Sequence, residues 1–230
     1  FLLLYACDTK PMAEKEPETE EISIENVPAE ISEEPEEPKL VLNLDSICLD
    51  SALKYALKVA QTSIATHGKL EEYYEVRSAD SSRLVNVRIA MGHLFSRWQQ
   101  HLVMKRHLGM DTYLDIFELK NRRFKGILKG EITPVGFMRD TIFDVNGDGA
   151  KDYLTHSYSP AGCCLRNAYA VYLNQPAQNT FAPMQEFINP TFSPAERLIR
   201  GIGYGYPEDG LGIYKRRWNG LKAEPVEQIY

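Results

Sequence analysis

The sequence predicts a mainly β domain, built from antiparallel propeller-like or sandwich-like sheets, with one N-terminal helix. Two observations lead to this fold class. Apolar residues recur at spacings of three and four between residues 45 and 67, as on one face of a helix, and then at a period of two from residue 85, as in half-buried strands. The chain has 230 residues, of which 43% are hydrophobic and 25% charged. This ordinary globular composition excludes wholesale disorder and a fibrous repeat.

The predicted helix covers about residues 45–67. Asp45 or Asp50 can cap its start, and Gly68 can close its end. Its apolar residues form a stripe that we expect to be a packing face: Leu49, Leu53, Ala56, Leu57, Ala60 and Ile64.

The first predicted strand is the alternating segment around residues 85–91. Asn121 lies between two further segments, where a tight hairpin turn favours it. Pro and Gly between residues 176 and 212 predict long turns. The remaining strands are expected over 100–107, 112–119, 122–129, 135–143, 153–158, 168–174, 212–218 and 221–229.

Residues 8–40 form an acidic segment with twelve acids, three lysines, five prolines and no aromatic residue, and thus a local charge of −9. Such a segment cannot bury enough apolar surface to offset the entropy of ordering it, so we expect a disordered tether. The whole chain carries −6, which leaves +3 for the other residues and gives no reason to expect nucleic acid as a partner. We therefore expect a signal remnant over 1–7, the tether over 8–40 and a single mainly β domain over 41–230.

The segment before the tether is apolar and ends in Leu4-Tyr5-Ala6-Cys7. It resembles the lipobox of bacterial lipoproteins, in which the signal is cleaved before a Cys that is then acylated. The resemblance implies that Cys7 is lipidated and that the protein is anchored to the bacterial outer membrane, on its periplasmic or surface face. The acidic flank is similar to the surface-export signals of Bacteroidetes lipoproteins. The alternative is an ordinary apolar N-terminus with a buried Cys7.

The most specific motif lies at residues 144–152, where oxygen-bearing groups occupy positions 1, 3, 5, 7 and 9 of a loop. Calcium binds six to eight oxygens, and alternate residues of a tight turn converge on one point. Gly149 permits the bend. Magnesium is the weaker candidate, because it requires octahedral geometry and keeps its waters. The predicted ligands of a structural calcium ion are the side chains of Asp144, Asn146, Asp148 and Asp152 and the carbonyl of Ala150.

This loop differs from an EF-hand, because Thr155 stands where the bidentate Glu would be and strands flank the loop. The D-x-N-x-D-G-x-x-D pattern between strands resembles the calcium loops of FG-GAP and related (VCBS-like) propeller repeats. The alternative is an Asn-Gly/Asp-Gly turn whose charges face water.

The resemblance continues through residues 135–225. An aromatic strand ending in Leu173-Asn174 follows the loop, then Asn189-Pro190, then a closing Tyr214-x-x-x-Trp218-Asn-Gly segment. This order is similar to a group of periplasmic propeller-like proteins, some of which are immunity proteins that inhibit peptidoglycan hydrolases. The resemblance implies a binding domain located in the cell envelope.

The remaining cysteines and histidines do not define a site. Cys48 could pair with Cys163 or Cys164, or all three could be buried thiols. His93, His101 and His107 fall in or beside strands, and we expect packed or surface roles for them. The aromatic residues between 204 and 218 are expected to be mainly core.

We therefore expect a non-catalytic, calcium-stabilised binding domain tethered to an envelope membrane, with a protein partner or cell-wall hydrolase as its ligand. The alternative is an immunity protein that blocks a peptidoglycan hydrolase. A third hypothesis is an enzyme that acts on envelope glycans or peptides.

Overall fold

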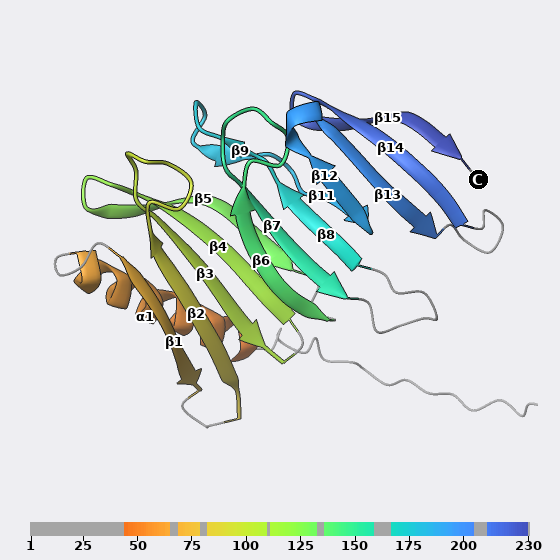
Figure 1. Ribbon diagram of the computed structural model, residues 1–230. Coiled ribbons are helices and arrows are strands. Elements are labelled where there is room, and N and C mark those ends of the chain that lie inside the picture. The colour runs from red at the N-terminus through yellow and green to blue at the C-terminus, as the bar shows by residue number, and fades with distance from the viewer. Residues whose placement is uncertain are drawn as a thin grey trace, which may run out of the picture. The chain divides into compact units, whose positions relative to one another are not determined.

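The computed structural model describes residues 44–64, 69–78, 82–109, 111–132, 136–158, 167–204 and 211–229. These residues form one α-helix and three large antiparallel sheets (Figure 1). The prediction of a mainly β fold with antiparallel sheets and one helix is thus confirmed. Cys7, the predicted tether over residues 8–40, Gly68, Cys163 and Cys164 lie outside the described residues.

Helix α1 spans Leu44–Ile64, close to the predicted range. The predicted stripe is its packing face: Leu49, Ala56 and Ala60 are buried, and the other three residues of the stripe are partly buried against the same core. Within the part of the chain that the structure describes, no helix is both long and apolar enough to cross a bilayer.

The first sheet is a meander in the order β1-β2-β3-β4-β5. Asn121 and Arg122 connect β4 to β5 with φ angles of +50° and +60°, as a two-residue turn with both φ angles positive requires. Strand β1 was not among the predicted strands; it lies at the edge of the sheet and is mostly exposed. The strands are β1 Leu70–Arg77, β2 Leu84–Gly92, β3 His101–Leu108, β4 Asp111–Lys120 and β5 Arg123–Ile132.

The second sheet has the order β11-β8-β7-β6, so β11 pairs with β8 and β6 forms the other edge. A short two-stranded ladder, β9 with β10, lies between β8 and β11 in the sequence. The strands are β6 Phe137–Phe143, β7 Asp152–Tyr158, β8 Asn167–Tyr172, β9 Asn174–Gln175, β10 Thr180–Phe181 and β11 Gln185–Ile188.

The third sheet is a second meander, in the order β12-β13-β14-β15. The expectation of long turns over residues 176–212 was wrong for residues 180–204, where β10, β11, β12 and β13 lie; residues 205–210 are outside the described residues. Pro190 begins β12, and Gly201 and Gly203 lie inside β13, so pairing with neighbouring strands overrides the turn preference of these residues. The elements are β12 Pro190–Ser193, the 3₁₀ helix η1 Pro194–Glu196, β13 Leu198–Tyr204, β14 Leu211–Asn219 and β15 Lys222–Ile229.

Three apolar cores hold these layers together in the order α1, first sheet, second sheet, third sheet (Figure 1). Side chains alternate across a strand, so β3 contributes to two cores. Leu102 and Met104 pack under α1, whereas Val103 packs toward Tyr153 of the second sheet. Ile199 and Trp218 of the third sheet pack on the opposite face of the second sheet.

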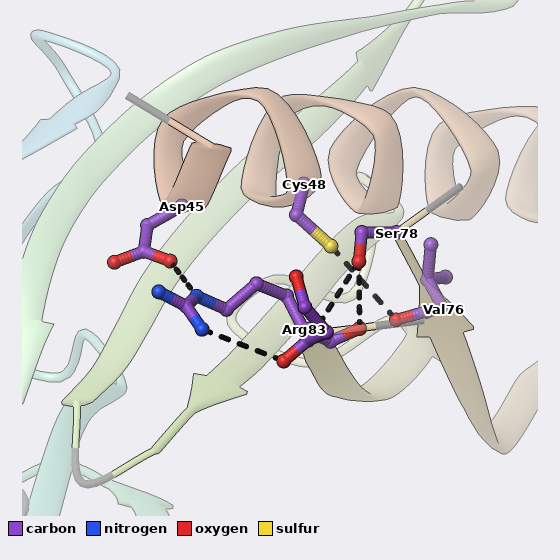
Figure 2. A network of polar contacts seen from close by, with 6 residues as sticks. Asp45, Cys48, Val76, Ser78 and Arg83 are labelled. Carbon is purple, nitrogen blue, oxygen red and sulfur yellow. Dashed lines mark hydrogen bonds and ion pairs between the residues drawn. The ribbon is translucent and has the colours of Figure 1, made fainter. Parts of the chain in front are cut away.

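Polar contacts fix the start of α1 to the connection between β1 and β2 (Figure 2). Arg83 donates to the Asp45 carboxylate, and the Arg83 backbone N–H donates to Ser78 Oγ at 2.9 Å. The Cys48 thiol, 3% exposed, points to the Val76 carbonyl oxygen at 4.0 Å. The pairing of Cys48 with Cys163 or Cys164 stays a prediction, since both lie outside the described residues.

Candidate functional site

The predicted calcium loop connects β6 to β7, the two strands of an antiparallel hairpin in the second sheet. Asp144 organises the turn. Its Oδ1 accepts the N–H groups of Gly147 at 2.7 Å and Asp148 at 3.2 Å, and its Oδ2 accepts the N–H of Gly149 at 2.8 Å. One carboxylate therefore satisfies three backbone donors and curls the chain around its own oxygens.

Asn146 and Asp148 lie in the same turn and contact each other. The Asn146 Nδ2 group donates to Asp148 Oδ2 at 2.9 Å, and the Asp148 N–H donates to Asn146 Oδ1 at 3.1 Å. Asp148 Oδ1 accepts the N–H of Ala150 at 2.8 Å. Asn146 is 3% exposed, whereas Asp148 is exposed. The predicted ligands at positions 1, 3 and 5 are thus gathered in one turn.

Asp152, at position 9, is fully buried at the start of β7. Its Oδ2 accepts the Val145 N–H at 2.9 Å, and its Oδ1 accepts the Asn174 N–H at 2.9 Å. Burial raises the pKa of the Asp152 carboxyl to about 7; the two N–H donors oppose this rise, and the nearby charges of Asp148 and Asp144 add to it. The ionised form of this carboxyl is therefore disfavoured unless positive charge is supplied.

Among the described residues, no three His, Cys, Asp or Glu side chains are placed to hold a metal ion by themselves. A cation in this loop would therefore depend on the Asn146 amide oxygen and the Ala150 carbonyl as well as on the carboxylates. These neutral oxygens are ligands that calcium accepts, so the donor chemistry of the loop fits calcium better than a metal that prefers nitrogen or sulfur.

Two glycines allow the loop its path. Gly147 has φ +74° and Gly149 has φ +89°, a region that side-chain-bearing residues rarely adopt. A Cβ on Gly147 would also lie 2.2 Å from the Pro194 carbonyl oxygen. Arg197 donates to the Gly147 carbonyl at 3.2 Å. The loop of the second sheet is thus packed tightly against the turn that precedes β13 in the third sheet.

An open groove of about 1000 Å³ lies beside the loop. Three segments that are distant in the sequence line it: the β2–β3 connection between His93 and Trp98, residues 148–151 of the predicted calcium loop, and Pro176-Ala177 of the β9–β10 turn. We call it the Trp98 groove, because Trp98 is 89% exposed there.

The β2–β3 connection is anchored on both sides of Trp98. Phe95 is buried and packs edge-on against His101 and Phe181, with ring centroids 5.1 and 5.2 Å away. The Gln99 side-chain amide donates to the Leu119 carbonyl, and the Leu119 N–H donates to the Gln100 carbonyl at 2.9 Å. The indole is therefore presented on a fixed piece of backbone.

The three histidines lie in different environments, although His93 is near enough to His101 for its charge to add to burial in lowering the His101 pKa. His93 is exposed and lines the Trp98 groove. His101 is 5% exposed, and burial lowers its pKa to about 4, against the charge of Glu118, which raises the pKa. His107 Nδ1 lies 2.7 Å from Thr112 Oγ1, and burial lowers the His107 pKa as well. The structure thus confirms that His101 is a packed residue.

Comparison with known proteins identified no matching family model, no matching curated protein and no matching solved structure. The resemblance to lipoproteins and to calcium-loop propeller repeats therefore stays a prediction.

Sequence reasoning missed the Trp98 groove. A signal was present, because Ser96-Arg97-Trp98-Gln99-Gln100 places a Trp among polar residues between two strands, where no apolar periodicity accounts for it. The rest of the lining, residues 148–151 and 176–177, is at least 50 positions away in the sequence, and only the fold brings it to Trp98.

Proposed function

We propose that residues 144–152 bind a structural calcium ion through Asp144, Asn146, Asp148, Asp152 and the Ala150 carbonyl. The observation that carries this proposal is the crowding of acidic oxygens around one turn, including the fully buried Asp152 carboxyl whose pKa is raised to about 7. A divalent cation would offset the repulsion among these carboxylates and favour the ionised form of Asp152.

Binding at this loop would stabilise more than the hairpin. Asp152 joins the loop to β9 through Asn174, and Gly147 lies against the turn before the third sheet. An ion bound to the folded form alone stabilises by RT ln(1 + [L]/Kd), about 2.7 kcal/mol at a hundredfold excess over Kd.

Isothermal titration calorimetry tests the metal assignment. We expect one calcium ion per chain for the wild type, and loss of binding for Asp144→Asn and Asp148→Asn, which keep the size of the side chain but remove its charge. Asp111→Asn, an exposed carboxyl at the start of β4, is the matched control. Wild-type protein that takes up no calcium would contradict the assignment.

We further propose a propeller-like relationship among the three sheets. Each is antiparallel, and successive sheets share an apolar core, as neighbouring blades do. The Trp98 groove is lined by connections of the first and second sheets and by the β9–β10 turn. The domain would therefore act by binding at these loops, with the stacked sheets as a rigid support.

The proposed setting is the bacterial outer membrane, with acyl chains on Cys7 as the anchor and residues 8–40 as the leash. This part of the proposal rests on the sequence alone. Replacing Cys7 by Ser should move the protein from the membrane fraction to the soluble fraction. Unchanged membrane association would contradict the lipid anchor.

A second candidate function is inhibition of a cell-wall hydrolase. The observation that favours it is Trp98, because an exposed Trp on anchored backbone is the kind of residue that dominates protein interfaces. An inhibitor should form a stoichiometric complex with one hydrolase and abolish its activity, and Trp98→Ala should restore that activity.

A further inference from the structure

We propose that the Trp98 groove binds an anionic glycan, with a sugar ring stacked on the Trp98 indole and the acidic group of the sugar held by Arg97 and Lys151. This inference rests on the proposed binding function and names its ligand class. It uses side chains that the calcium assignment does not involve.

The Trp98 side chain is strongly exposed to solvent. At 89% it is the most exposed of the large hydrophobic side chains among the described residues, although Trp is usually well buried in folded proteins. The Trp98 backbone N–H donates to Ser96 Oγ at 3.1 Å, which fixes the turn and leaves the indole free to meet a ligand. An exposed flat ring can stack on the C–H face of a sugar.

The backbone around Trp98 is held in place before any ligand binds. Phe95 is locked in the core between the first and second sheets, and Gln99 and Gln100 are held to β4 by the hydrogen bonds to Leu119. Little backbone entropy remains to be lost on binding, so a modest contact area can give measurable affinity.

The Trp98 groove carries positive charge from two side chains. Arg97 and Lys151 are exposed in the groove, and within the described residues neither side chain has a hydrogen bond or ion pair. The acid that lines the groove is Asp148, whose two carboxylate oxygens already accept from Ala150 and Asn146 inside the loop. The groove therefore offers two unpaired cations to a ligand, which favours an anion.

The lining of the Trp98 groove does not suit a peptide that binds as an added strand. The lining comes from connections and turns, so the groove offers no strand edge along which a peptide could add as a further strand. Its apolar lining beside Trp98 consists of Phe95, Ala150, Pro176 and Ala177, in an open trough of about 1000 Å³. An open groove with one flat aromatic ring at its side suits an oligosaccharide whose sugar rings lie across it.

Intrinsic fluorescence and calorimetry test the proposal on the full chain. The protein has two tryptophans, and Trp218 is 4% exposed, so a ligand that covers Trp98 should shift the emission of the exposed indole to shorter wavelength. The probes are a hexuronate oligosaccharide, peptide-free peptidoglycan glycan strands and a neutral maltohexaose. The hexuronate carries its carboxylate on a uronic acid, whereas the peptidoglycan strands carry it on a lactyl-substituted sugar. Comparing the two shows which kind of acidic sugar the groove prefers.

We expect at least one acidic probe to bind, with affinity at least tenfold above that of maltohexaose. Trp98→Ala should weaken binding at least tenfold, and Arg97→Gln/Lys151→Gln should weaken it tenfold or more and reduce its salt dependence. The matched controls are Tyr73→Ala, an exposed aromatic on β1, and Arg123→Gln/Lys125→Gln, exposed cations on β5; these should bind as the wild type does.

The proposal is overturned if no acidic glycan binds, if maltohexaose binds equally well, or if Trp98→Ala retains full affinity. Binding of poly-glutamate in preference to both acidic glycans would also overturn it, in favour of a protein partner. Calcium uptake is measured on the same samples. Calcium uptake without glycan binding refutes this inference alone, whereas glycan binding without calcium uptake refutes the metal assignment alone.

Discussion

Lys105 Nζ lies 2.7 Å from Asp140 Oδ2, and this contact joins β3 of the first sheet to β6 of the second. The Lys105 side chain is 6% exposed and that of Asp140 is 26% exposed. Tyr153 donates to the same carboxylate oxygen at 2.8 Å, and the Lys105 ammonium also lies 5.4 Å from the centre of the Phe137 ring. A mostly buried ion pair thus links the two stacked sheets.

Replacing Lys105 by Met should destabilise the protein by about 3 kcal/mol, because it leaves the Asp140 carboxylate largely buried without its cation. Asp140→Asn should cost a similar amount. The double variant should lose clearly less than the sum of the two single variants, as expected for groups in direct contact. Urea denaturation of the four proteins measures the coupling, and strict additivity would contradict a stabilising pair.

Asp140 also predicts acid sensitivity. Burial alone would raise the pKa of Asp140, but the charge and hydrogen bond of Lys105 and the hydrogen bond of Tyr153 hold the pKa below its usual value. The folded pKa is lower than the unfolded one, so the stabilisation is present above about pH 4 and is lost as the pH falls through the folded pKa. Asp140→Asn should remove this part of the pH dependence.

The buried pair of Arg106 and Asp115 should hold α1 on the first sheet. Arg106 Nη2 lies 2.6 Å from Asp115 Oδ2, and Nη1 donates to the Leu49 carbonyl of α1 at 2.8 Å. Arg106→Met should cost about 4 kcal/mol and lower hydrogen-exchange protection in α1. The exposed pair of Arg88 with Glu71 is the control, and Arg88→Met should cost no more than about 1 kcal/mol. Equal losses in both variants would contradict the assignment.

His101 predicts a second, separate pH window. Its pKa is about 4 in the folded protein, because burial disfavours the charged ring, against about 6.5 when unfolded. The unfolded form binds the extra proton first, so stability should fall by up to about 3 kcal/mol as the pH drops from 6.5 to 4. His101→Phe keeps the ring beside Phe95 and should flatten this window. Urea denaturation between pH 4 and 6.5 measures both proteins. The same pH dependence of stability in His101→Phe as in the wild type would contradict the prediction.

Gly147 and Gly149 form a matched pair in the proposed calcium loop. Both have positive φ, but a Cβ on Gly147 would meet the Pro194 carbonyl at 2.2 Å, whereas a Cβ on Gly149 has no atom within 4 Å. Gly149→Ala should therefore cost about 1 kcal/mol from backbone strain. Gly147→Ala should cost roughly 1–3 kcal/mol more, because the turn before β13 must move. Thermal unfolding in chelator measures both; equal costs would show that the contact is not tight.

The sequence predicted those features whose cause is local. The apolar periodicity of α1, the apolar alternation in β2 and the Asn121 turn each depend on a few neighbouring residues. All three lie close to their predicted positions. The edge strand β1 is mostly exposed, and β11 to β13 lie among Pro and Gly residues that favour turns, so these strands depend on pairing with neighbouring strands more than on a local pattern. The fold brings Asp144, Asn146 and Asp148 into one turn, because they are neighbours in the chain. Trp98 and Lys151 are 53 positions apart, and only the stacking of the first two sheets brings them to one groove.

The most direct test of calcium binding by residues 144–152 is the melting temperature of the wild-type protein in chelator and in millimolar calcium. A gain of about 2.7 kcal/mol should raise the midpoint by roughly 5–10 °C in a domain of this size. Calcium binding at residues 144–152 predicts this rise for the wild type and none for Asp144→Asn/Asp148→Asn. A wild-type midpoint that is the same in chelator and in calcium would contradict it, and residues 144–152 would then be a turn stabilised by its own hydrogen bonds.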